Sequence, residues 1–137
     1  MGTQQLFLLV LGIVIVGLAV IAGVGSFRQQ TKANQADDAL SRSVAIAQEA
    51  VNWRGRAVIY GGGGGGNFTP LATNGLEILG IGDAPAYTEH AIQSASGNVL
   101  EIVGVSTLDT DVGAYVRVTG DQIDSTATRL DGSITLP

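Results

Sequence analysis

The chain has 137 residues, with seven basic and twelve acidic side chains, a formal net charge of −5 and no cysteine. The missing cysteines exclude disulfides, thiolate nucleophiles and Cys-ligated zinc. Residues 57–137 carry two basic and nine acidic side chains, which argues against binding nucleic acid or anionic lipid through clustered Lys and Arg.

The first element in the chain is an apolar run from Leu6 to Phe27, in which only Ser26 is polar. A helix of these 22 residues rises about 33 Å, enough to cross a hydrocarbon core of about 30 Å. A cleaved secretory signal fits poorly, because the run is too long and no Lys or Arg precedes it. A permanent membrane span and a helix that packs against copies of itself both remain open.

The first cations, Arg28 and Lys32, follow the apolar run. The positive-inside tendency would therefore place the acidic part of the chain in the cytoplasm. A composition rich in Gly, Ser, Thr and short strands is instead expected outside it. Removal of a basic leader from in front of Met1 would resolve this conflict.

An amphipathic helix is predicted to continue directly from the apolar run. Its apolar positions are three or four residues apart, as one helix face requires. They are Ala33, Ala36, Leu40, Val44, Ala47 and Val51. We expect one nearly continuous helix from about residue 3 to about residue 54, whose core-facing side chains are Leu40, Val44, Ala47, Val51 and Trp53.

Six consecutive glycines, 61–66, follow the end of this helix. A phosphate cradle is disfavoured, because no GKS or GKT motif follows and no strand–loop–helix pattern surrounds the run. A flexible surface loop, or a loop that lies flat against a neighbouring subunit, is the better prediction.

Strand patterns dominate after Gly97. The segments NVLEIVGVST, AYVRVTG, STATRL and SITLP predict short strands, with a hairpin turn at Asp131-Gly132 between the last two. Short connections indicate an antiparallel meander. Between residues 68 and 96 only GLEILGIG favours a strand, and the remainder is predicted as loop.

Candidate catalytic or metal-binding residues are few. His90 is the one histidine and is predicted to be a solvated loop residue. Asp109 and Asp111 resemble the start of a calcium loop, but the third ligand, the glycine and the closing glutamate are missing. We therefore expect no cofactor and no catalysis, with these two aspartates as weak calcium candidates.

The apolar-then-amphipathic helix of Met1 to about Val51, with the strand order after Gly97, resembles the plan of type IV pilins and pseudopilins. The resemblance implies an α+β fold with segments 1–27 (membrane span or filament core), 28–56 (amphipathic helix) and 57–137 (glycine-rich loop and sheet). It also implies a leader peptidase that exposes Met1, which becomes methylated. This family usually has glutamate at the fifth position, where this chain has Gln5, an amide that can still accept a hydrogen bond from a neighbour's terminal amine.

By this resemblance the chain is a structural subunit of an extracellular type IV pilus-like filament, serving attachment or motility. Its partners would be copies of itself, the inner membrane before assembly, and assembly machinery with a separate ATPase. Two alternatives are a pseudopilin of a secretion or DNA-uptake machine and a single-pass membrane-anchored binding protein. The residues expected to assemble the filament are Met1, Gln5, Leu6, Leu9, Gly12, Val16, Gly17 and Gly23.

Overall fold

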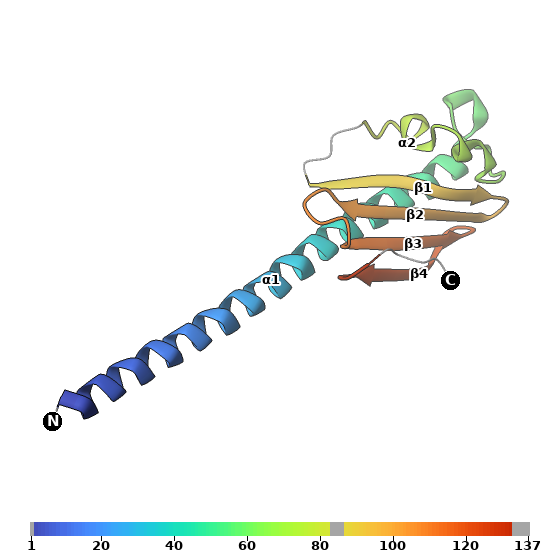
Figure 1. Ribbon diagram of the computed structural model, residues 1–137. Helices are drawn as coiled ribbons and strands as arrows, with labels where there is room; N and C mark the ends of the chain where they lie inside the picture. Colours follow the sequence, from blue (N-terminus) through green and yellow to red (C-terminus); the bar gives the residue numbers. More distant parts are fainter. Residues whose placement is uncertain (1, 83–86, 133–137) are drawn as a thin grey trace. The chain divides into compact units, whose positions relative to one another are not determined.

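The computed structural model describes residues 2–82 and 87–132 and shows an α+β fold (Figure 1). A 54-residue helix, α1 (Gly2–Gly55), packs against a four-stranded antiparallel sheet. The chain divides into two compact units, Met1–Lys32 and Ala33–Pro137, and the second is called the head below. The predicted fold class and the predicted extent of the helix are both confirmed.

The described part of the first unit consists of α1 alone. Its large apolar side chains from Leu6 to Phe27 are 48–77% exposed. By length and composition α1 is able to cross a membrane. No proline or charged residue interrupts α1 before Arg28, which is consistent with an unbroken helix despite the four glycines.

The sheet is a meander with the strand order β1-β2-β3-β4. The strands are β1 (Thr88–Ser96), β2 (Val99–Ser106), β3 (Gly113–Thr119) and β4 (Gln122–Arg129). The last three lie where the sequence predicts strands, and all pairs are antiparallel, as expected. The predicted strand SITLP falls at residues 133–137, outside the described residues.

Two predictions between residues 68 and 96 are wrong. The stretch assigned to loop contains β1, which has few β-branched residues and forms because β2 offers it a ladder of partners. The stretch that favoured a strand instead contains the short helix α2 (Gly75–Ile78). A short apolar run does not distinguish strand from helix by periodicity alone. Residues 2–82 and 87–132 also contain two 3₁₀ helices, η1 (Val58–Tyr60) and η2 (Thr69–Ala72).

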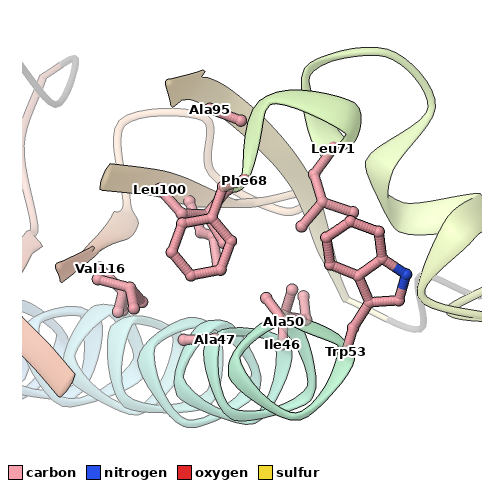
Figure 2. Close-up of a cluster of buried hydrophobic side chains, with 11 residues drawn as sticks. Ile46, Ala47, Ala50, Trp53, Phe68, Leu71, Ala95, Leu100 and Val116 are labelled. Atoms are coloured by element: carbon pink, nitrogen blue, oxygen red, sulfur yellow. The ribbon is translucent and has the colours of Figure 1, made fainter. Parts of the chain in front are cut away.

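The hydrophobic core lies between the C-terminal half of α1 and one face of the sheet (Figure 2). Phe68 and Leu71 fill the space above Ala47, Ala50 and Trp53 and are fully buried. The sheet contributes Leu100, Ile102, Val116 and Val118.

The buried face of α1 is centred on small side chains rather than on the predicted stripe. Ala47 and Trp53 are buried as predicted, whereas Leu40, Val44 and Val51 pack against the edge of the core and are only partly buried. The fully buried centre is Ala36, Ala39, Ser43, Ala47 and Ala50. Small side chains there let the helix backbone approach the sheet closely, and the larger aliphatic residues close the flanks.

The opposite face of the sheet carries a polar cluster. The Tyr115 hydroxyl donates to Glu101 Oε1 at 3.2 Å, and the Arg117 guanidinium lies 3.2 Å from the same oxygen. Burial, followed by the Glu101 charge, raises the pKa of Tyr115. Tyr115 and Arg117 thus lie on one face of β3 and Val116 and Val118 on the other, as the alternation in this strand predicts.

Candidate assembly surface

The sequence-predicted assembly residues lie on the exposed apolar part of α1. Leu6, Leu9 and Val16 are 62–66% exposed, and apart from the adjacent residues and the nearby helix backbone no described atom lies within 4 Å of the positions that a Cβ would take at Gly12, Gly17 or Gly23. Met1 is outside the described residues.

Helical geometry groups most of these residues on one side of α1. At 100° per residue, the side chains at positions 5, 9, 12, 16 and 23 point within about 60° of one another. Two glycines, Gly12 and Gly23, therefore lie three turns apart on the same line as Gln5. Such a line lets a second helix approach closely, as small residues do in membranes. Gly17 points to a different side.

At the other end of α1, the glycine segment 61–66 is held against the helix terminus. Gly63 and Gly65 donate their backbone N–H groups to the carbonyls of Trp53 (2.8 Å) and Arg54 (2.6 Å), which have no partner within the helix. Gly62, Gly64 and Gly66 donate to other local carbonyls. The segment is therefore a C-terminal cap of α1 rather than a flexible loop, and its amides are not available to cradle a phosphate.

This cap requires glycine at individual positions. A Cβ on Gly62 would lie 2.3 Å from the Arg56 carbonyl oxygen, and one on Gly63 would lie 2.8 Å from the Trp53 ring. Gly61, Gly64 and Gly65 have φ between +68° and +76°. The Trp53 indole N–H donates a hydrogen bond to the Gly61 carbonyl at 3.0 Å, and this bond fixes the backbone position of the first glycine.

Arg54 joins four parts of the head, a role that the sequence did not suggest. Its guanidinium donates to the Gly66 carbonyl (2.7 Å), to Asn98 Oδ1 in the β1–β2 turn (3.0 Å) and to Asp121 Oδ1 in the β3–β4 turn (3.0 Å). It also lies 5.3 Å from the centre of the Phe68 ring. Since its side chain is only 14% exposed, Arg54 fixes the helix end, the glycine segment and both turns together.

His90 lies in β1 facing α1, so the prediction of a solvated loop residue is wrong. Its ring is half-buried above Gly104, and Nε2 lies 3.4 Å from the Ala39 carbonyl oxygen. Burial lowers the pKa of His90 below its ordinary 6.5, against the opposing effect of the Ala39 hydrogen bond. Arg42 lowers the pKa further and Asp38 raises it. Residues 88–92, TEHAI, show no alternation of apolar and polar side chains, so no local signal in the sequence places His90 in a strand.

The two calcium candidates form a local turn. Asp109 Oδ1 accepts the backbone N–H of Asp111 at 3.1 Å. Within residues 2–82 and 87–132, no group of three or more His, Asp or Glu side chains is arranged to hold a metal ion. The geometry assigns these aspartates to the β2–β3 loop, where Leu108 beside them is 66% exposed.

No family model, curated protein or solved structure matches this chain. The architecture itself, a long N-terminal apolar helix packed on a four-stranded antiparallel sheet, is pilin-like. The helix suggests association with a membrane or export.

Proposed function

We propose that this protein is a structural subunit that polymerises through residues 6–27 of α1 into an extracellular type IV pilus-like filament. The observation that carries the proposal is the continuity of α1. Its C-terminal half forms one wall of the core, while residues 6–27 are apolar on all sides of the helix and exposed. A plain anchor needs no such helical continuity with a folded core.

The energetics favour a bundle over a pair of helices. Burying about 400 Å² of apolar surface on one subunit contributes on the order of 10 kcal/mol. Fixing one subunit in an assembly costs about 4–15 kcal/mol. One neighbour therefore only offsets that cost, whereas several neighbours around each helix give a stable polymer. The line of Gln5, Gly12 and Gly23 supports close contact with one of these neighbours, and in this proposal Gln5 accepts a hydrogen bond from a neighbour's N-terminal amine.

The subunit waits in the inner membrane before assembly, with residues 6–27 as its span, and a separate machine with its own ATPase extracts it. In this proposal the protein has no catalysis of its own, and its filament serves attachment or motility. A pseudopilin in a secretion or DNA-uptake machine would use the same interface for a shorter periplasmic assembly.

The experiment is electron microscopy of material sheared from cells that produce the protein, with mass spectrometry of the same pellet. We expect filaments composed mainly of this chain and starting at a methylated Met1. Leu9→Lys and Val16→Lys should abolish them, while Ser125→Lys on exposed β4 should not. Survival of filaments with Lys at both apolar positions would contradict the proposal.

A second variant separates polymerisation from anchoring. Gly12→Leu keeps the segment apolar and able to insert into a membrane, but it blocks close approach along the line of Gly12 and Gly23. We expect normal amounts of membrane-inserted subunit and a severalfold loss of filaments. A single-pass anchored binding protein, the alternative that α1 also allows, would be indifferent to this change and would be found only in detergent extracts.

A further inference from the structure

Two exposed apolar patches lie at opposite ends of the head. The first, patch A, is η1, where Val58, Ile59 and Tyr60 are 70%, 84% and 74% exposed. The second, patch B, is Leu108 with Tyr87, which are 66% and 59% exposed. Thr107 donates its N–H to the Tyr87 carbonyl at 2.9 Å, so the two members of patch B belong to adjoining backbone.

The hydrogen bonds of the head place these patches far apart. Patch A follows the C-terminus of α1, which Arg54 ties to the turns at Asn98 and Asp121. Patch B is at the other end of β2, beside Ser106, whose hydroxyl bonds to Gln35. Figure 1 shows the β1–β2 turn, which contains Asn98, and the β2–β3 loop, which contains Leu108, at opposite ends of the sheet. The eight residues of β2 separate them by about 25 Å.

Patch A is presented by a fixed element. The amides of the glycine segment bind the end of α1, and a Cβ at Gly64 would meet the Val58 side chain at 2.7 Å. Three consecutive large apolar side chains are therefore exposed to solvent on a turn whose backbone is fixed by hydrogen bonds. Because that turn is already ordered, a partner that covers it loses little additional conformational entropy.

The charges beside the patches are complementary. Arg56, whose side chain is half-exposed, lies two residues before patch A, and its guanidinium is 3.9 Å from the Glu49 carboxylate. Patch B is flanked by Asp109 and by the exposed Asp111. A contact of patch A with patch B would bring Arg56 toward these carboxylates. A contact of patch A with a second patch A, or of patch B with a second patch B, would instead bring groups of the same charge together.

We propose that patch A of one head docks on patch B of a second copy of this chain. Such a contact is heterologous, because two different surfaces meet, and it leaves one free patch at each end for the next copy. The inference rests on the proposed filament and adds to it a head-to-head contact distinct from the helical bundle.

The test is disulfide cross-linking in sheared filaments, which the cysteine-free sequence makes unambiguous. Ile59→Cys and Leu108→Cys are introduced together in the full chain. Within one molecule the two sites are too far apart for a disulfide, which needs Cα atoms about 4.4–6.8 Å apart. We expect a ladder of dimers, trimers and higher species on a non-reducing gel, which collapses to monomer under reduction.

The controls are the two single variants and the pair Ile59→Cys with Ser125→Cys, which should give no ladder. Intact filaments without a ladder from the Ile59–Leu108 pair would overturn the docking proposal and leave the filament standing. A dimer from Ile59→Cys alone would also overturn it, because that result means a symmetric contact. If neither this protein nor its variants forms filaments, the proposed function fails first, and electron microscopy of the same samples shows which case holds.

Discussion

Replacing Arg54 by methionine removes the guanidinium but keeps a long, helix-compatible stem. The lost interactions are hydrogen bonds to Gly66 and Asn98, the ion pair with Asp121 and the contact with Phe68. The two hydrogen bonds contribute about 1 kcal/mol each, which is below the range of about 1.5–3 kcal/mol for a charged donor because the exposed acceptors can rehydrate. Asp121 is 81% exposed, so its ion pair adds about 0.5 kcal/mol, and the Phe68 contact adds a similar amount.

We therefore expect Arg54→Met to lower the free energy of unfolding of the head by about 3 kcal/mol. Urea unfolding of the full chain in mild detergent measures this, with the fluorescence of Trp53, the only tryptophan, as the probe. Trp53 is 5% exposed and bonds to Gly61 beside Arg54, so its emission reports on this end of the head.

The matched control is Arg42→Met on the same helix. Arg42 makes one exposed ion pair with Asp38 at 3.3 Å, so its loss should cost less than about 0.5 kcal/mol. Arg54→Lys keeps the charge but not the planar fork, and it should fall between the two. Equal effects of Arg54→Met and Arg42→Met, or a loss below about 1 kcal/mol for Arg54→Met, would refute the role given to Arg54.

Three further predictions on the packing of the head are tested by the same urea assay. Gly62→Ala meets the backbone of Arg56 at 2.3 Å and should cost more than about 2 kcal/mol, whereas Gly65→Ala, with open space and φ of +72°, should cost about 1 kcal/mol. Equal losses would mean that the glycine segment is not the packed cap described above. Gly104→Ala places a Cβ 2.9 Å from both His90 Nε2 and Ser43 Oγ, so we expect a loss of about 1–3 kcal/mol, and an unchanged midpoint would show that the helix does not approach β2 so closely. Folding lowers the pKa of His90 below its ordinary 6.5, so the unfolded chain binds a proton at this imidazole more readily than the folded head does. The contribution of His90 to stability is therefore present above pH 6.5 and is lost as the pH falls through the folded pKa. The urea midpoint should drop between pH 7.5 and pH 5.5 and drop less in His90→Gln, and equal drops in both proteins would contradict this assignment.

The sequence predicted those parts of the fold that depend on long, regular patterns. The 3–4 spacing and the absence of proline predicted α1 to within two residues, and β-branched alternation predicted β2, β3 and β4. The predicted buried face of α1 is rotated slightly from the observed one, because the prediction was based on large apolar residues such as Leu40, which lie at the edge of the core. In the structure, alanines and Ser43 occupy the centre of the buried face, and their small size allows the close approach of the helix to the sheet that is seen between Ser43 and Gly104.

The features that were missed depend on contacts between distant residues. Nothing near Arg54 in the sequence indicates that its guanidinium will reach Asn98 and Asp121, 44 and 67 residues away. His90 was misplaced with β1, whose pairing with β2 overrides weak local propensity. The six glycines at 61–66 predicted a flexible loop. In the structure the absence of side chains allows this segment to pack against the C-terminus of α1.

The most direct test of the central proposal is a cryo-electron microscopy reconstruction of the sheared filaments, with the position of residues 6–27 as its readout. We expect these segments at the filament axis, packed on the same segments of several neighbouring copies, with Gly12 at a close helix contact. Filaments whose axis is formed by another part of the chain would contradict the account. Recovery of the chain only as monomers in detergent extracts would do so as well.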